Sequence, residues 1–392
     1  MSGSERTRRI AVVTGTRAEY GLLKPGMDAL RDANDIELQV VVTGMHLSPA
    51  HGTTVNDLVA DGFEVDREVY MQLAGDTGRS MAKSLGVGTS GMAEALGDLD
   101  PDLVLVLGDR DEALAAGLAA VHMNVPVAHV HGGDSMGGAI IDDSIRHALT
   151  KFAHLHFPAS ERSHERILKL GEEPWRVTTV GAPGLDAVLA GEFSDPSEVR
   201  ASLNLDPVRP LALVVQHPVT TRPDEAGAQM RETLAAVDSF DVRPVVVHPN
   251  SDAGSERIVA VIEERRAFDE SEGLVAFRSL PRRDYLGLMA AAEVMVGNSS
   301  SAIIEAPSLD LPVVDVGPRQ AGRERADHTL SVPHDREAIE SALERCLHDA
   351  PHRETVAAAS NPYDYGGAGN RIAERLRTVE LGERLLRKRL TF

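Results

Sequence analysis

The chain is poor in cysteine, in lysine and in long apolar runs. Its 392 residues include one cysteine, Cys346, so no disulfide can form within the chain, and a metal site built on several cysteines is excluded. Such a composition is typical of a reducing compartment, and we expect the cytoplasm. The N-terminus, MSGSERTRR, lacks the apolar segment of a secretory signal, and no later apolar run is long enough to span a bilayer. The sequence therefore predicts no membrane partner.

Positive charge is also scarce, since 40 Lys and Arg residues face 60 Asp and Glu residues, and the formal net charge is −20. Binding to nucleic acid or to an anionic membrane depends on a basic surface that contacts phosphates, so neither is an expected partner. Only five of the basic residues are lysines, and an anionic ligand would have to be held by arginines placed locally. The acidic surface fits either ordinary solvation or a salt-rich cytoplasm, and stability that rises with KCl would favour the second.

Apolar runs of about five residues alternate with amphipathic segments along the whole chain, which is typical of parallel sheets covered on both faces. We predict strands at 10–14, 38–43, 103–107, 125–131, 155–159 and 177–180, and in a second series at 211–216, 245–248, 274–277, 294–296 and 313–316. The proline-containing stretch 191–210 separates the two series, so we place a domain boundary near residue 190. A charged amphipathic segment, 370–388, predicts a terminal helix. With 42% apolar residues, each half can form a core.

Polar motifs follow the predicted strands at the ends where open α/β sheets bind ligands. TGTRAEYGLLKP, 14–25, does not match the G-x-G-x-x-G spacing of dinucleotide-binding proteins, which argues against a dehydrogenase. Arg17 and Lys24 in this motif are candidate contacts for an anion near a helix N-terminus, although Lys24 fits an ordinary surface charge equally well. In GDRDEA, Asp109 and Arg110 lie at the tip of a buried strand. Asp109 is a candidate catalytic carboxylate or a helix cap, and Arg110 a candidate anion ligand.

HVHGGDSMGGAIIDDSIRH, 129–147, is the segment richest in reactive side chains. On an extended strand His129 and His131 point to the same side, and Asp134 follows. Two imidazoles and a carboxylate also suit a divalent metal, but no third spaced histidine or cysteine cluster accompanies them, and we predict no metal site. In the helix that begins near residue 141, the i, i+4 spacing pairs Asp142 with Arg146 and Asp143 with His147. Ordinary helix pairing explains Asp143 well enough.

The second half carries a similar set of motifs. His217 ends one predicted strand, and His248 and Asn250 follow another. In GNSSSAIIEAP, Ser299 and Ser300 open a helix, where hydroxyls and free backbone N–H groups favour phosphate. Glu305 is a candidate acceptor for a ribose diol. Arg319 and Arg323 follow a further strand.

These motifs, together with PNSDAGSE and GPRQAGRE, occur in an order that resembles the hydrolysing UDP-N-acetylglucosamine 2-epimerases of sialic acid synthesis, over about residues 9 to 375. The resemblance implies an α/β fold of the GT-B type, with two Rossmann-like domains, 1–190 and 191–368, and a cleft between them. It also implies that a C-terminal helix, 369–392, packs back on the first domain. A homodimer is expected on the same ground, and no cofactor.

The resemblance implies a role for each candidate residue. The catalytic candidates are Asp109, His131, Asp134, Asp142 and His217, with His131 and Asp134 as alternatives for the family's catalytic glutamate. The substrate-binding candidates are Arg17, Lys24, Arg110, Arg146, His147, Asn250, Ser299, Ser300, Glu305 and Arg319. The implied reaction converts UDP-N-acetylglucosamine and water into UDP and N-acetylmannosamine through a glycal. His131 is the candidate base, because an imidazole can have a pKa near the working pH.

Several alternatives stay open from the sequence. The enzyme can be an epimerase of another N-acetylated nucleotide sugar, or a non-hydrolysing epimerase that keeps the UDP. A retaining glycosyltransferase would use the same fold but needs an acceptor sugar. A sensor that binds a nucleotide sugar without turnover is a different class of protein, and the number of carboxylates near an anionic ligand disfavours it.

Overall fold

The computed structural model describes residues 7–49, 52–73, 75, 77–137, 141–250, 252–268 and 273–392. The chain forms two compact units, of which the first comprises residues 1–134, 142–186 and 363–392 and the second 135–141 and 187–362. Each unit is built on one six-stranded parallel sheet. No helix in the described part of the chain is long and apolar enough to cross a membrane.

The first sheet has the strand order β3-β2-β1-β4-β5-β6. Its strands are β1 (Arg8–Thr14), β2 (Ile36–Thr43), β3 (Arg67–Val69), β4 (Leu103–Leu107), β5 (Val127–Val130) and β6 (Leu155–Phe157). The accompanying helices are α1 (Arg17–Arg31), η1 (Gly44–Leu47), α2 (Val55–Ala60), α3 (Gly78–Leu99), α4 (Asp111–His122), α5 (Ile141–Phe152), α6 (Glu161–Lys169), η3 (Pro174–Arg176), α7 (Gly184–Leu189), α15 (Ala368–Thr378) and α16 (Glu383–Leu386).

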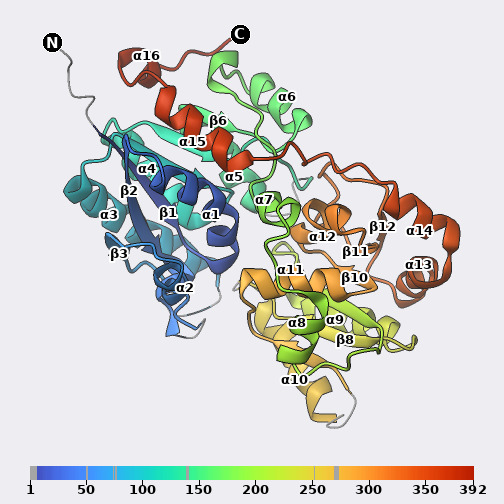
Figure 1. Ribbon diagram of the computed structural model, residues 1–392. Coiled ribbons are helices and arrows are strands. Elements are labelled where there is room, and N and C mark those ends of the chain that lie inside the picture. The colour runs from blue at the N-terminus through green and yellow to red at the C-terminus, as the bar shows by residue number, and fades with distance from the viewer. Residues whose placement is uncertain are drawn as a thin grey trace. The chain divides into compact units, whose positions relative to one another are not determined.

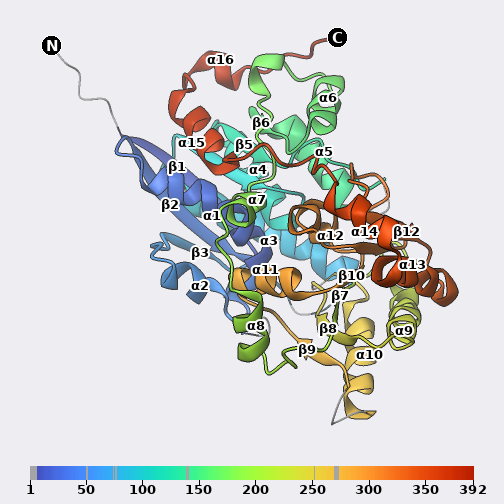
Figure 2. The same ribbon diagram turned by 45° about the vertical axis from the view of Figure 1, so that its right-hand side comes forward.

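Both faces of this sheet are covered, as the continuous apolar runs require. Ile10 and Val12 on β1 pack on one face with α1, α2 and α15. Ala11 and Val13 pack on the opposite face with α3, α4 and α5. Figures 1 and 2 show α15, at the red end of the chain, lying along α1 at the blue end. Residues more than 340 positions apart thus share one core.

The second sheet has the order β12-β11-β10-β7-β8-β9. Its strands are β7 (Leu211–Val215), β8 (Arg243–Val247), β9 (Val275–Phe277), β10 (Val294–Gly297), β11 (Val313–Val316) and β12 (Thr329–Val332). Its helices are α8 (Pro196–Ser202), η4 (Pro223–Glu225), α9 (Ala226–Val237), α10 (Ser255–Phe268), α11 (Arg282–Ala291), α12 (Ser300–Ile304), η5 (Ala306–Leu309), α13 (Arg336–His348) and α14 (Ala350–Ala357). Val214 packs with α9, α10 and α13, whereas Leu213 packs with α8 and α11 on the other face.

The predicted α/β class is confirmed, and some predicted elements are wrong. Residues 177–180 form no strand, because only Val177 makes a bridge, to His156. The terminal segment is not one helix, since α15 ends at Thr378 and a short α16 follows. The sequence analysis missed β3 and β12, which are edge strands with few buried side chains. It also took α8 for part of a linker.

Candidate active site

In the first unit, β4 and β5 end side by side, and each is followed by a residue with a positive φ. Gly108 (φ +79°) turns the chain after β4, so that Asp109 and Arg110 come at the sheet edge. β5 ends at Val130, and His131 has a φ of +62°. The expected alternation of His129 and His131 along one strand is therefore wrong, because His131 lies in a left-handed turn that non-glycine residues seldom adopt.

Arg146 of α5 joins the ends of these two strands. Its guanidinium donates to the backbone carbonyl of His131 at 2.8 Å and pairs with the carboxylate of Asp109. Only 2% of the Arg146 side chain is exposed, compared with 18% of Asp109. A buried cation thus fixes the carboxylate and the turn at His131 together, while Asp109 keeps a face open to solvent.

The turn from His131 to Asp134 is held from a second side by α6. Arg166 donates to the carbonyl of Gly133, whose φ is +76°. A Cβ at this position would lie 2.2 Å from the carbonyl oxygen of Ser163, so only glycine fits. Asp134 itself is 3% exposed. Arg166 was missed from the sequence because its segment, SHERILK, has the pattern of an ordinary amphipathic helix.

His147 lies within the same group of charges. Burial lowers the pKa of His147, and the nearby Arg146 and Arg166 lower it further, against Asp143 and Asp134, which raise it. The ring is therefore neutral at physiological pH. His131, Asp134, Asp143, Arg146 and His147 thus lie within one group of charges, and Asp142 is half-buried on the first turn of α5.

Replacing Arg166 tests how strongly this cluster depends on α6. We expect Arg166→Met to lower kcat by about tenfold, because the Gly133 carbonyl loses its donor and the turn that carries Asp134 is less restrained. Arg162 on the same helix is exposed, and Arg162→Met is the matched control. Steady-state turnover assays measure both variants. Equal kcat for the two would show that the contact with Gly133 is unimportant.

His129 contacts the turn that follows β4. It is fully buried, and its Nε2 donates to the Gly108 carbonyl at 2.7 Å, so the proton is on Nε2. Burial lowers the pKa of His129 to about 3, which keeps the ring neutral. In the described part of the chain no three His, Cys, Asp or Glu side chains are grouped so that they could hold a metal ion. We assign His129 to the shape of the turn at Gly108.

The basic candidates near β1 pair with acids of the same unit. Arg17, the first residue of α1, lies 2.5 Å from Asp57. Lys24 lies 2.8 Å from Asp28, one turn along the same helix. Arg110 lies 3.3 Å from Glu112 and is 25% exposed.

Two glutamates in the same motifs as Arg17 and Arg110 are buried, and the sequence analysis did not single them out. Glu19 is 5% exposed, and its carboxylate accepts from the backbone N–H of Gly15 at 2.6 Å. Glu112 is 4% exposed and fills the space where a side chain at Gly15 or Gly44 would lie. Burial and the charge of Glu112 raise the pKa of Glu19 to about 8. Both glutamates occur in the motifs TGTRAE and GDRDE, but their proximity depends on the pairing of β1 with β4.

The raised pKa of Glu19 predicts a pH dependence of stability. A carboxyl whose folded pKa exceeds its unfolded value contributes stability below about pH 4.5, and this contribution is lost as the pH rises to about 8. Glu19→Gln keeps an acceptor for Gly15 and removes the ionisation. We expect the variant to melt at a higher temperature than the parent at pH 8 and to lose this advantage at pH 4.5. Calorimetry at both pH values measures it, and an equal difference at the two would contradict the assignment.

In the second unit, Asn298 ties the ends of β7 and β10 together. Its side chain accepts from the backbone N–H of His217 at 2.7 Å and donates to the carbonyl of His217 at 3.0 Å. Its own carbonyl accepts from Arg319 at 3.1 Å and from Gln320 at 2.8 Å. Asn298 is fully buried. The sequence analysis quoted this residue within GNSSS but gave it no role.

The same contacts fix the ring of His217. Its Nδ1 accepts from the backbone N–H of Asn250 at 3.2 Å, so the proton of the neutral ring is on Nε2. His217 is 8% exposed, and Asn250 is half-buried. This arrangement presents an N–H donor at the carboxyl end of β7. The backbone N–H of His248 donates to the backbone carbonyl of Phe277 at 2.9 Å.

Ser299 and Ser300 lie at the start of α12. Ser299 is the N-cap, and its hydroxyl is 2.7 Å from that of Ser301, which in turn is 2.6 Å from the Tyr285 hydroxyl. Burial raises the pKa of Tyr285 to about 12, so this hydroxyl stays protonated and can donate.

Glu305 follows α12 and is 3% exposed, in an ion pair with Arg282 of α11. Arg282 was not predicted. Arg319 and Arg323 are each 7% exposed. The second unit therefore gathers hydroxyls, N–H groups and arginines at the carboxyl edge of its sheet, a set suited to a phosphorylated ligand.

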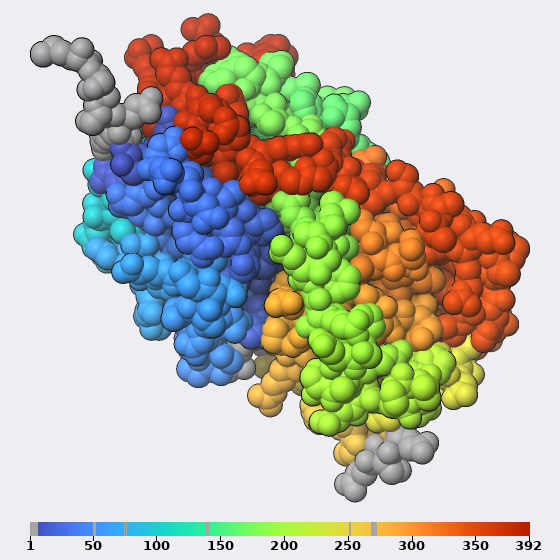
Figure 3. Space-filling view, in the orientation of Figure 1, coloured from blue at the N-terminus to red at the C-terminus, as the bar shows by residue number. Residues whose placement is uncertain are grey.

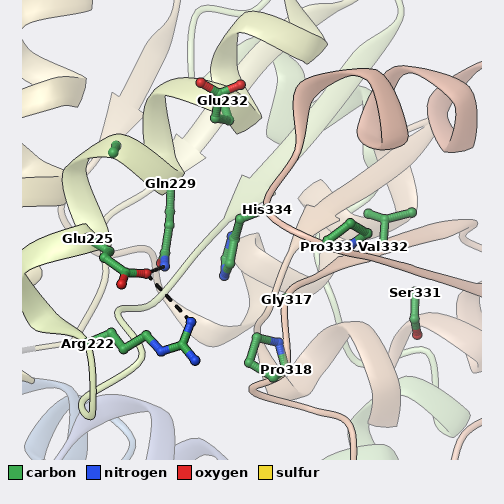
Figure 4. Close-up of a pocket in the computed structure, with 11 residues that line it drawn as sticks. Arg222, Glu225, Gln229, Glu232, Gly317, Pro318, Ser331, Val332, Pro333 and His334 are labelled. Carbon is green, nitrogen blue, oxygen red and sulfur yellow. Dashed lines mark hydrogen bonds and ion pairs between the residues drawn. The ribbon is translucent and has the colours of Figure 1, made fainter.

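A cavity of about 670 Å³ lies elsewhere in the second unit, between α9 and the segments after β11 and β12 (Figure 4). In its lining, Glu225 contacts Arg222 at 3.8 Å and Gln229 at 3.2 Å. Both ring nitrogens of His334 are buried without a hydrogen-bond partner among the described residues, and its Nε2 lies against Gly317. None of the predicted nucleotide-binding residues lines this cavity.

Comparison with known proteins identifies the family. The family described as UDP-N-acetylglucosamine 2-epimerase matches residues 28–377. The chain is 37% identical to a UDP-N,N'-diacetylbacillosamine 2-epimerase (hydrolyzing) of Legionella pneumophila, over 97% of this chain and 98% of the relative. It is 32% identical to a GDP/UDP-N,N'-diacetylbacillosamine 2-epimerase (hydrolyzing) of Campylobacter jejuni, over 82% and 84%. A UDP-N-acetylglucosamine 2-epimerase of Neisseria meningitidis is 30% identical, over 86% and 87%.

The fold is shared with solved structures. A crystal structure of UDP-GlcNAc 2-epimerase from Neisseria meningitidis bound to UDP-GlcNAc has a TM-score of 0.79 and 19% identity, and the match covers 95% of this chain and all of that one. A putative UDP-N-acetylglucosamine 2-epimerase from Listeria monocytogenes gives 0.78 and 21%, over 96% and 98%. The order of motifs, the two parallel sheets and the family match agree, and the chain belongs to the UDP-N-acetylglucosamine 2-epimerase family.

Proposed function

We propose that the protein is a hydrolysing 2-epimerase that converts a UDP-linked 2-acetamido sugar and water into UDP and the free 2-epimeric sugar. The observation that carries the proposal is the cluster in the first unit, where Arg146 holds the Asp109 carboxylate beside the turn of His131 to Asp134. This cluster supplies candidate acids and a candidate base for the proposed transfer of the sugar C2 proton. The similarity to two hydrolysing relatives favours release of the free sugar.

The proposed chemistry has two steps. In the first, a base removes the C2 proton, the C1–O bond breaks, and UDP leaves with the bonding electron pair, which gives a glycal with a C1–C2 double bond. In the second, an acid delivers a proton to C2 on the face opposite to the one deprotonated, water adds its oxygen to C1, and a base takes the surplus proton of that water. Asp109, Asp142, His131 and Asp134 are the proposed proton-transfer groups. Arg146 is a positioning residue in this scheme, because it binds Asp109 and the His131 carbonyl.

The second unit is proposed to hold the UDP. His217 presents Nε2–H, and Ser299, Ser300 and Arg319 supply further donors that stabilise negative charge on the departing diphosphate. Glu305 and Asn250 are proposed to contact the nucleoside. In the first unit, Arg17, Lys24, Arg110 and His147 stay proposed substrate contacts. A homodimer stays a prediction, which light scattering of the purified protein tests.

For the sugar we propose UDP-N,N'-diacetylbacillosamine, since the relative with 37% identity is named for it, and UDP-N-acetylglucosamine as the second candidate, from a relative with 30% identity. Incubation of each substrate in deuterated water, followed by NMR of the products, separates the possibilities. Free 2-epimeric sugar deuterated at C2 supports the proposal and identifies the substrate. A nucleotide sugar labelled at C2 would indicate a non-hydrolysing epimerase, and binding without turnover would indicate a sensor.

A further inference from the structure

The helix that carries Asp142 and Arg146, α5, is capped by the C-terminal segment of the chain. Lys388 Nζ lies 3.1 Å from the carbonyl oxygen of Thr150 and 2.9 Å from that of Lys151, both in the last turn of α5, and 2.5 Å from that of Ala153. These carbonyls have no partner within the helix ladder. A positive charge at this end also complements the helix dipole. The side chain of Lys388 thus caps the C-terminal end of α5.

The charge of Lys388 is balanced by Glu172, which is 1% exposed. One carboxylate oxygen lies 2.8 Å from Lys388 Nζ and 3.2 Å from His156 Nε2, and the other lies 2.5 Å from Lys151 Nζ. Since Lys151 belongs to α5, Glu172 connects the helix to the capping group by a second route. Only 17% of the Lys388 side chain is exposed, so these contacts are largely shielded from solvent.

Arg176 holds the segment that delivers Lys388. Its guanidinium donates to the carbonyls of Leu385 at 2.7 Å, Arg384 at 3.0 Å and Arg387 at 3.1 Å, and Arg176 is 1% exposed. Leu385 is fully buried in the first core. Figure 3 shows the red surface of the C-terminal segment against the green surface of the segment that contains α6. The last residues are therefore an ordered part of the first unit.

A continuous set of hydrogen bonds leads from this cap to the cluster. Lys388 binds the Thr150 carbonyl, and the Thr150 hydroxyl donates to the carbonyl of Arg146 at 3.1 Å. Arg146 then binds Asp109 and His131. Thr150 and Asp142 are eight residues apart, or roughly 12 Å along a helix with a rise of 1.5 Å per residue. Asp142 thus lies on the first turn of α5, Lys388 contacts its last turn, and Arg146, one turn before Thr150, connects the helix to Asp109 and His131.

We propose that Lys388 is a positioning residue for the active site, which it serves by capping α5 and thereby fixing Arg146, Asp109 and the His131 turn. The proposal rests on the proposed function for the statement that these groups act on the sugar. Lys388 itself does not touch substrate in this assignment. Its loss should therefore affect the rate of the chemical step more than the binding of substrate.

The test compares Lys388→Met with Arg389→Met in the full chain. Arg389 is the next residue, is also basic and is exposed, so its variant is the matched control. We expect Lys388→Met to lower kcat for UDP release by about 10- to 100-fold, the scale of a small misplacement, and to change KM by less than about twofold. We expect Arg389→Met to leave both unchanged. Propylamine, which supplies the missing ammonium group, should partly restore kcat to Lys388→Ala and not affect the other variants.

Hydrogen exchange gives a readout that does not depend on activity. Backbone amides of residues 145–153 should exchange at least about tenfold faster in Lys388→Met than in Arg389→Met, with α4 as the internal reference. Equal exchange in α5 and equal kcat for the two variants would overturn the proposal. A parent protein inactive towards every nucleotide sugar would refute the proposed function, and the exchange rates would still decide whether Lys388 caps α5. If Lys388→Met does not fold, Lys388→Gln replaces it in both measurements.

Discussion

Asp109→Asn is expected to lower turnover by about 10² to 10⁴-fold, the usual contribution of a positioned general acid or base. The asparagine has the shape of the aspartate and can still accept from Arg146, so the turn after β4 should persist. It cannot take up or deliver a proton at the same position. Initial rates of UDP release, combined with a melting curve to verify folding, measure the effect.

Asp111→Asn, two residues further on, is the control for loss of one negative charge near the same helix start, and its turnover should remain within about twofold of the parent. The double variant Asp109→Asn with Arg146→Met adds a second test. Because the two side chains act as a unit, the double variant should be scarcely slower than the slower single variant. Full activity of Asp109→Asn would remove Asp109 from the mechanism, and additive effects would separate it from Arg146.

Glu172→Gln is expected to cost about 3–5 kcal/mol of stability at pH 7, because its removal leaves the largely buried ammonium group of Lys388, 17% exposed, without its counter-charge. Burial alone would raise the pKa of Glu172, but the hydrogen bonds from His156, Lys151 and Lys388 outweigh it and lower the pKa to about 2. A lowered carboxyl pKa gives stability that is fully present above about pH 4.5 and is lost as the pH falls towards about 2. The difference between parent and variant should follow this window.

Calorimetry of both proteins measures this difference, and a cost of this size lowers the melting temperature of a domain of about 200 residues by roughly 10 °C. Glu165→Gln is the control, since Glu165 is 61% exposed and lies 3.8 Å from Lys169, so that its loss should change stability by less than about 1 kcal/mol. If Glu172→Gln melts with the parent at pH 7, the buried charges do not depend on Glu172.

Most strands were predictable because a parallel strand covered by helices on both faces is indicated by a short run of mainly apolar residues. Leu103–Leu107 is an unbroken apolar run, and Val313–Val316 is apolar except for Asp315; both strands were predicted with their observed bounds. β12 has one exposed and three half-buried residues and gives no such signal. Residues 177–180, Val-Thr-Thr-Val, are β-branched without being a strand, because pairing needs a neighbouring strand and only Val177 finds a bridge partner.

The sequence predicted the candidate site only as polar residues at the ends of predicted strands. The sequence placed Asp109 and Ser299 after strands, where ligands bind in open sheets, and placed His131 as the last residue of a strand. It did not indicate that Arg146 pairs with Asp109, since the two are 37 residues apart. Nor did it indicate His131 in a left-handed turn, because the tertiary contacts of Arg146 and Arg166 with that turn determine its backbone. Asn298 and Glu112 were passed over because neighbouring residues had the more familiar motifs.

The amino-acid sequence by itself determined the α/β class, the positions of most strands and the family, since these depend on short apolar runs and on motifs of a few adjacent residues. Only the tertiary structure decided which charges are buried together. Glu172, His156 and Lys388 become one network because the chain folds back over more than 200 residues, and Glu19 meets Glu112 because β1 pairs with β4. The physical reason is that burial strengthens electrostatic interactions between groups that are brought close, and closeness is a property of the folded chain.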